Sequence, residues 1–175
     1  ADQTPLVATL DVSLPDVGIH FTRDSVVRAA APALQASFTL PQKPKWKTDS
    51  VMALRLKNIG SSPAPSLTLS IPVPTGLVLS EDAPVDIVEI TAVGRSPSSA
   101  TAMQRAGNLI VIQRDLAVGQ EIEVMFPVSI PRFGETPLAF YCTARIETDE
   151  GMTMQTAQWL WPDTRQYVMP LMFKP

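Results

Sequence analysis

The chain has 175 residues, of which 45% are hydrophobic and only 18% are charged, and its net charge at pH 7 is -3. A chain of this length can bury a core without disulfide bonds or a metal ion. The acidic balance argues against a broad basic face, and so against a nucleic-acid partner or an anionic membrane surface. Seventeen prolines favour short strands joined by loops over long helices.

Residues 4–14 are predicted to form a strand, because apolar residues occupy every second position and therefore share one face. These residues are Leu6, Ala8, Leu10, Val12 and Leu14. A shorter apolar run follows over residues 17–21. Asp24 or Ser25 is then predicted to cap a brief helical turn over residues 26–30. The one dense basic stretch, with Lys43, Lys45 and Lys47 around Trp46, is predicted to be a solvated loop.

The most regular alternation of the chain spans residues 51–79. Met52, Leu54 and Leu56 share one face, and after a turn rich in Gly, Ser and Pro the pattern resumes. Its second run places Leu67, Leu69 and Ile71 inward. Two alternating runs around a turn are typical of antiparallel strands with one dry and one wet face. A β-sandwich is therefore the predicted architecture.

Further strands are predicted after this pair, within residues 85–90, 109–113, 122–130, 138–146 and 152–161. Pro127 indicates an edge position or a bulge in its strand. Residues 94–108 are predicted to form a long loop. The inward faces should make one core, built from Leu54, Leu56, Leu67, Leu69, Val124, Phe126 and Phe140. Cys142, the single cysteine, shares the inward face with Phe140 and is expected to stay reduced and unreactive.

Three short motifs between Val51 and Trp161 carry a resemblance to a known family. They are Asn58-Ile59-Gly60, Pro74-Thr75-Gly76-Leu77 and Leu116-Ala117-Val118-Gly119. In this order they resemble the conserved repeat domain of bacterial and archaeal surface proteins. That resemblance implies an immunoglobulin-like fold and an extracellular structural or adhesive role. The chain departs from the pattern at Ile71-Pro72-Val73, where the family carries an Asp before the proline bend, and the first 50 residues lie outside it.

The predicted fold is thus all-β, an immunoglobulin-like antiparallel β-sandwich with N- and C-terminal extensions. Residues 1–50 would hold the N-terminal strands, residues 51–162 the sandwich, and residues 163–175 an apolar tail, all within one compact unit.

No catalytic or cofactor-binding residue is predicted. His20 is the only histidine, and no nucleophile motif accompanies it, so it is expected on the outward face of a strand. One histidine and one cysteine are too few for zinc, and no Gly-rich phosphate loop occurs. Weak calcium candidates are Glu81, Asp82 and Asp86, and a second acidic loop holds Glu147, Asp149 and Glu150. Solvated turn acids are commoner than calcium ligands.

Trp159 and Trp161 lie two residues apart and admit two interpretations. They could form a platform on which sugar rings stack, with Tyr141 as a third ring. The favoured interpretation is that both cover the sandwich core, because each buries a large apolar area.

The predicted function is that of a non-enzymatic, extracytoplasmic structural or assembly subunit that associates by β-strand addition. Its partner would be a copy of itself or another surface protein. The expected interaction residues are Leu6, Ala8, Leu10, Val12 and Leu14 in the N-terminal strand, and Tyr167, Val168, Leu171 and Phe173 in the tail. The start at Ala1 without Met suggests removal of a signal peptide, and no apolar run is long enough to span a membrane. Two alternatives remain: a carbohydrate- or protein-binding adhesion module, and an enzyme that uses only the carboxylates of residues 81–86.

Overall fold

The computed structural model describes residues 5–14, 19–28, 30–42, 44–45, 48–80, 84–98, 102–130 and 139–162. Within these ranges the chain forms strands and no helix, and so no helix that is long and apolar enough to cross a membrane. All strand pairs are antiparallel. The predicted all-β class is confirmed.

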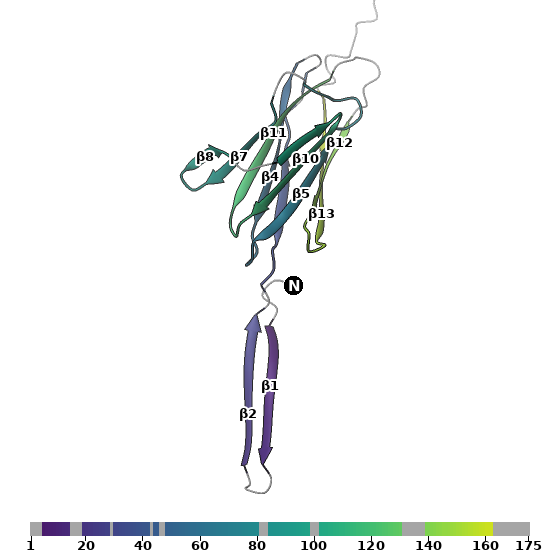
Figure 1. Cartoon of the computed structure of the whole chain (residues 1–175). Coiled ribbons are helices and arrows are strands. Elements are labelled where there is room, and N and C mark those ends of the chain that lie inside the picture. Colours follow the sequence, from purple (N-terminus) through teal and green to yellow (C-terminus); the bar gives the residue numbers. More distant parts are fainter. Residues whose placement is uncertain are drawn as a thin grey trace, which may run out of the picture.

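Two sheets pack face to face as a sandwich (Figure 1). The five-stranded sheet has the order β13-β12-β5-β10-β9, with bounds β5 (Ala64–Pro72), β9 (Ala102–Ala106), β10 (Leu109–Leu116), β12 (Phe140–Glu147) and β13 (Thr153–Leu160). The six-stranded sheet has the order β3-β4-β11-β7-β8, with β6 beside β11. Its bounds are β3 (Leu34–Thr39), β4 (Ser50–Asn58), β6 (Val78–Leu79), β7 (Asp86–Thr91), β8 (Gly94–Pro97) and β11 (Glu121–Ser129).

The core lies between the two sheets and is made by the alternating residues that the sequence predicts. All seven predicted core residues are buried to 2% exposure or less: Leu54, Leu56, Leu67, Leu69, Val124, Phe126 and Phe140. Strand β3, from the first 50 residues, also takes part, because it pairs with β4 and buries Phe38. The inward apolar faces of both sheets therefore supply one continuous core.

The remaining two strands form a separate hairpin, β1 (Pro5–Leu14) and β2 (Ile19–Arg28). It projects from one end of the sandwich (Figure 1). None of its described side chains belongs to the buried core. The strand predicted over residues 4–14 is confirmed. The helical turn predicted over residues 26–30 is wrong for Val26, which lies in β2 opposite Val7. Pairing with β1, and the β-branched Val side chain, outweigh the local capping signal.

Two other sequence predictions need correction. Residues 94–108 hold the short strands β8 and β9 in addition to loop. Both faces of these edge strands are exposed, so no alternation of apolar residues marks them. Pro127 lies in β11, which is central and not an edge. On one side of β11, strand β7 pairs with residues 121–125 and strand β6 pairs with residues 128–129. Pro127 lies between these two paired segments, where a missing backbone N–H breaks no strand pairing.

The joint between hairpin and sandwich is built on Asn58 and Gly60. Residues 31–33 run beside residues 59–61: the Ile59 N–H donates to the Ala33 carbonyl at 2.7 Å, and the Ser61 N–H donates to the Ala31 carbonyl at 3.1 Å. A Cβ on Gly60 would collide with the backbone of Ala31 and Ala33. Glycine at this position therefore allows the close approach of the connecting segment.

The side chain of Asn58 stabilises this joint through four hydrogen bonds. Its Nδ2 donates to the Ser62 carbonyl at 2.8 Å and to the Leu116 carbonyl at 3.1 Å. Its Oδ1 accepts from the Gly60 N–H at 3.0 Å and the Ala33 N–H at 3.4 Å. One buried side chain thus ties the connecting segment to two turns of the sandwich.

Candidate functional site

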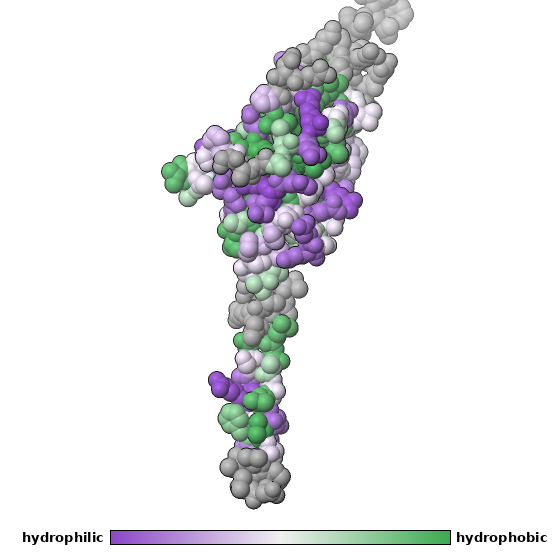
Figure 2. Space-filling view, in the orientation of Figure 1, coloured by the Kyte–Doolittle hydropathy of each residue, from purple (hydrophilic) through white to green (hydrophobic). Residues whose placement is uncertain are grey.

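Hairpin β1–β2 carries an uncovered apolar face. Residues opposite each other in an antiparallel pair share a face, so this hairpin apolar face comprises Leu6, Ala8, Leu10, Val12 and Phe21. Leu6, Leu10 and Phe21 are 59%, 58% and 50% exposed. Figure 2 shows hydrophobic residues running along the projecting hairpin. Leu14 ends β1, opposite Ile19.

The hairpin apolar face is interrupted at its middle by one charge. Arg23 lies opposite Leu10, with the rows of Leu6 and Ala8 on one side and those of Val12 and Leu14 on the other. The guanidinium is exposed, with aliphatic side chains opposite it on β1 and with Phe21 and Ser25 beside it on β2. A partner for this face must therefore accommodate a cation.

The opposite face of the hairpin is mostly polar and internally paired. Thr9 donates to Asp24 at 2.8 Å, and the His20 ring nitrogen lies 3.4 Å from the Asp11 carboxylate. His20 is exposed on a strand, as predicted. Because no third strand of the described residues pairs with β1 or β2, both outer edges of the hairpin are open. A two-stranded hairpin alone is marginally stable in water, and a third strand or a covered face would stabilise it.

A second exposed apolar surface is an aromatic cluster of Tyr141, Trp159 and Trp161 on the outer face of the five-stranded sheet. The ring centroids of Tyr141 and Trp159 are 4.8 Å apart, and those of Trp159 and Trp161 are 6.3 Å apart. The three side chains are 52%, 53% and 62% exposed. The prediction that the tryptophans cover the core is wrong. Tyr141 pairs with Trp159 outward, while their neighbours Phe140 and Leu160 pair inward and fill the core.

Polar side chains extend this outer face along the same two strands. Thr143, Arg145 and Gln155 share the outward row with the aromatic cluster. Arg145 donates to the Glu147 carboxylate at 2.6 Å. The rings thus border hydrogen-bonding groups, an arrangement that suits a sugar or a polar polypeptide.

The aromatic cluster and the hairpin lie toward opposite ends of the sandwich. The start of β5 lies at the Asn58 end, because the Leu116 carbonyl bonds to Asn58 and Leu116 pairs with Ala64. Strand β12 runs antiparallel to β5, with Glu147 beside Thr68. Tyr141 therefore lies at the end away from the joint with the hairpin.

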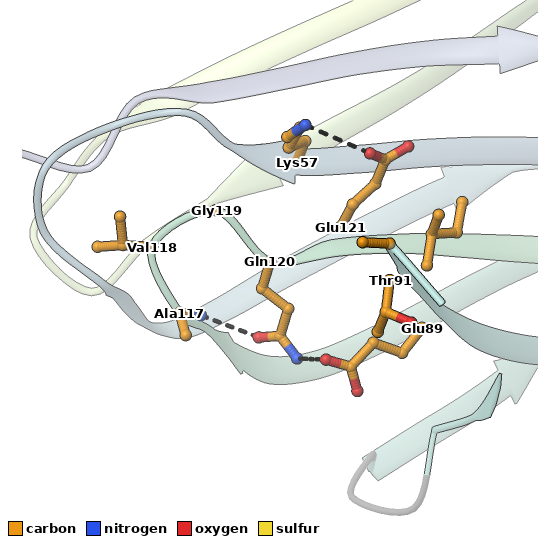
Figure 3. Close-up of a pocket in the computed structure, with 10 residues that line it drawn as sticks. Lys57, Glu89, Thr91, Ala117, Val118, Gly119, Gln120 and Glu121 are labelled. Carbon is orange, nitrogen blue, oxygen red and sulfur yellow. Dashed lines mark hydrogen bonds and ion pairs between the residues drawn. The ribbon is translucent and has the colours of Figure 1, made fainter. Parts of the chain in front are cut away.

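An open depression of about 650 Å³ lies beside the Leu116–Gly119 turn (Figure 3). Gln120 spans it, since its Nε2 donates to Glu89 at 2.7 Å and its Oε1 accepts from the Ala117 N–H at 2.9 Å. Lys57 lies 3.6 Å from Glu121. The polar groups that line the depression are thus engaged with one another, which favours a structural role for this turn.

A buried carboxylate lies on the outer face of the six-stranded sheet. Glu123 has a 3% exposed side chain and lies 2.8 Å from Arg55 Nε and 2.9 Å from Arg95. The first contact is a hydrogen bond, and it raises the pKa of Arg55 above its usual value. The second is an ion pair without hydrogen-bond geometry. Arg95 comes from β8 and reaches across β7, so Glu123 ties the sheet edge to its centre.

Cys142 is 1% exposed, as predicted from its place in the alternation. Burial raises the pKa of its thiol to about 11. The thiolate, which is the reactive form, is therefore scarce near neutral pH.

Several predicted residues lie outside the described part of the chain. They are the calcium candidates Glu81 and Asp82, the loop residues Lys43, Trp46 and Lys47, and the tail residues Tyr167, Val168, Leu171 and Phe173. The third calcium candidate, Asp86, is exposed at the start of β7, and Lys45 is exposed. Across the described ranges, no three His, Cys, Asp or Glu side chains gather in a group that could hold a metal ion.

Sequence reasoning missed Arg23, Phe21 and the Glu123 ion pairs. Phe21 belongs to an alternation from Ile19 to Val27 that Arg23 and Ser25 interrupt, so β2 gives a weaker signal than β1. Glu123 occupies an outward position of β11, where a charged residue is ordinary. Only the tertiary structure, in which Arg55 of β4 and Arg95 of β8 approach its carboxylate, shows that it is buried.

No protein-family model matches the chain, and no curated protein matches its sequence. Solved structures do resemble it. A variant of BcpA, the major pilin subunit of Bacillus cereus, superposes with a TM-score of 0.54 at 10% identity, over 90% of this chain and 48% of that one. The RrgA Jo.In complex gives a TM-score of 0.53 at 9% identity, over 87% of this chain and 98% of that one. The collagen binding domain of Erysipelothrix rhusiopathiae surface protein RspB gives a TM-score of 0.50 at 12% identity, over 93% of this chain and 57% of that one.

At these identities the likeness shows the fold alone. It confirms the predicted immunoglobulin-like sandwich. The chain spans about half the length of the BcpA chain that it matches. Membership of the conserved repeat domain family stays a prediction from the three sequence motifs.

Proposed function

We propose that this chain is a non-enzymatic, extracytoplasmic module of a surface structure that associates with protein by β-strand addition through hairpin β1–β2. The observation that carries the proposal is the hairpin itself. Among the described residues, it combines two open edges, an exposed apolar face and no side chain in the sandwich core. Such an element gains stability when a neighbouring strand extends its sheet.

The fold is compatible with this role. BcpA is a pilin subunit and RspB is a surface protein, and both contain sandwiches of this kind. An extracytoplasmic location for this chain is part of the proposal. The proposed partner is another copy of this chain, and the apolar sequence of residues 166–175 offers a second element for association.

The test measures the molar mass of the folded chain by light scattering over a range of concentrations, with hydrogen exchange at each concentration. Strand addition predicts that the mass rises and that amides along one outer edge of the hairpin become protected. A double variant, Leu6→Thr with Leu10→Thr, should weaken both effects. Val7→Thr, a single change on the opposite face, should leave them unchanged. A monomeric chain with unprotected hairpin edges at every concentration contradicts the proposal.

A second candidate function is a carbohydrate- or protein-binding adhesion module. The observation that favours it is the exposed cluster of Tyr141, Trp159 and Trp161 beside polar side chains. Screening the purified chain against a glycan array tests it. Binding that Trp159→Ala abolishes and the hairpin double variant leaves intact would support this alternative.

A further inference from the structure

We infer that the hairpin adds to the open edge of strand β13 in a second copy of this chain, with the aliphatic row of β1 beside the aromatic cluster. This inference rests on the proposed function, for which it names the accepting edge. It follows from the lengths and charges of the edge strands, from the side chains along β13, and from the position of Arg23.

Strand β13 is the best acceptor among the sandwich edges of the described chain. Edge strands resist addition when they are short or carry charged or proline residues. Strand β13 has eight residues and neither charge nor proline. Strand β8 has four residues with Arg95 and Pro97, and β9 has five with Arg105. Strand β3 also lacks charge and proline, but it has only six residues, and its Ala36 carbonyl already accepts from the Thr156 hydroxyl of β13 at 3.5 Å.

The exposed side chains of β13 complement those of β1. Trp159 points outward from β13 and contacts Tyr141 on the strand behind it. The matching row of β1 is aliphatic over Leu6, Ala8, Leu10 and Val12. Aromatic and aliphatic side chains on adjacent strands form favourable cross-strand pairs. Addition of β1 to β13 would thus join two exposed apolar surfaces into one and shield part of each.

The position of Arg23 opposes the simplest rival, in which two hairpins pack face to face. Arg23 lies in the middle row of the hairpin apolar face. A two-fold packing of identical faces would bring two guanidinium groups together in an apolar interface, which is unfavourable. When β1 adds to β13, Arg23 instead lies one strand farther out on β2, about 10 Å from β13, and β13 itself carries no charge.

This contact joins unlike surfaces and therefore continues from copy to copy. The hairpin leaves the sandwich at the Asn58 end, while β13 lies along the side of the sandwich (Figure 1). A heterologous contact of this type leaves a free hairpin at one end and a free β13 edge at the other. The expected product is an open chain of copies.

Disulfide trapping between two differently substituted chains tests the inference. One chain carries Leu6→Cys, Ala8→Cys, Leu10→Cys or Val12→Cys, one at a time, and the other carries Ala157→Cys on the outward row of β13. A control acceptor carries Ala106→Cys, an exposed alanine on the edge strand β9. Native Cys142 is buried and should not interfere. Light scattering on the same mixtures reports association independently of cross-linking.

The inference predicts mixed disulfides with Ala157→Cys, strongest at one β1 position, and at least tenfold slower formation with Ala106→Cys. Trp159→Ala in the acceptor should slow the reaction. If the chains associate but cross-link only between hairpins, or to Ala106→Cys, the inference is wrong and the proposed function survives. If the mass stays monomeric, both fail. If Ala157→Cys resists small thiol reagents in a monomer until residues 163–175 are removed, the chain's own C-terminal segment covers this edge, and the inference is again wrong.

Discussion

Asn58 uses the full hydrogen-bonding capacity of its amide at a buried position. Two carbonyls accept from its nitrogen and two backbone N–H groups donate to its oxygen. Removing the side chain would leave all four backbone groups without these partners. Buried polar groups that lose their partners are costly, typically about 1–3 kcal/mol each.

We therefore expect Asn58→Ala to lower the free energy of unfolding by at least about 2 kcal/mol. Asn108→Ala is the matched control, because Asn108 is an exposed turn residue, and its effect should stay within about 0.5 kcal/mol. Urea titrations of both variants measure the difference. Equal midpoints for the two variants would show that the Asn58 bonds contribute nothing to stability.

The buried thiol of Cys142 should make the stability of the folded chain depend on pH. Its thiol has a pKa of about 11 in the folded chain, against 9.0 for the unperturbed group, because burial disfavours the thiolate. Below pH 9 the thiol is neutral in both states, and its contribution to stability is fully present. As the pH rises from 9 toward 11, the unfolded chain loses the proton first, so the thiol's contribution declines.

The stability of the native chain should thus fall more steeply between pH 9 and 11 than that of Cys142→Ala. Lysines and tyrosines titrate in the same pH range in both chains, so the difference between the two stability curves reports the effect of the thiol. Urea unfolding at several pH values provides the measurement. Parallel stability curves would mean that the thiol ionises as readily in the folded chain as in the unfolded one.

At the scale of elements, sequence alternation predicts strands well where one face is buried. Strands β4, β5, β11 and β12 follow it because one sheet face meets the core. It fails for β8 and β9, which are exposed on both faces, and for the second half of β2, where Arg23 and Ser25 interrupt the row. Burial creates the pattern, so strands without burial give no signal.

The candidate site was predictable only in part, for the same reason. The aliphatic row of β1 is plain in the sequence, although its exposure is not. Strand β13 has apolar residues in both phases, with Trp159 in one and Leu160 in the other. Its neighbour β12 decides between them, because Phe140 must face the core and pairs with Leu160. The register between β12 and β13 therefore places Trp159 on the exposed face. That register depends on residues far apart in the sequence, so the sequence pattern of β13 alone does not reveal it.

The β7–β8 hairpin depends on a long-range ion pair. Arg95 of β8 reaches the buried Glu123 of β11 across β7, and β8 has only four residues to pair with its neighbour. Arg95→Ala should therefore accelerate amide hydrogen exchange in β7 and β8, by about tenfold if local opening becomes easier by about 1.4 kcal/mol. Arg145→Ala, which removes an exposed ion pair on the other sheet, is the control. Unchanged exchange in β8 after Arg95→Ala would contradict this role.

At the scale of the whole molecule, the hairpin and the sandwich are structurally separate elements. The described core draws on β3 and later strands and on no side chain of β1 or β2. The connecting segment, residues 31–33, belongs to the sandwich, because its backbone bonds to residues 59–61 and to Asn58. The stability of the sandwich should thus depend on this segment and not on the hairpin that precedes it.

Two truncations separate these contributions. A chain that begins at Ala30 lacks the hairpin but keeps the connecting segment, and we expect it to fold with a Tm within a few degrees of the full chain. A chain that begins at Leu34 also loses the partners of Ile59 and Ser61 and exposes Asn58, so its Tm should fall by about 4 °C for each kcal/mol lost. Calorimetry at low concentration, where association is negligible, gives both values.

A large loss of stability on removal of residues 1–29 would mean that the hairpin supports the sandwich within one chain. Equal values for the two truncations would mean that the Asn58 joint is dispensable. Retained stability in the chain that begins at Ala30, together with loss of association, is the result expected of a projecting arm that acts between chains.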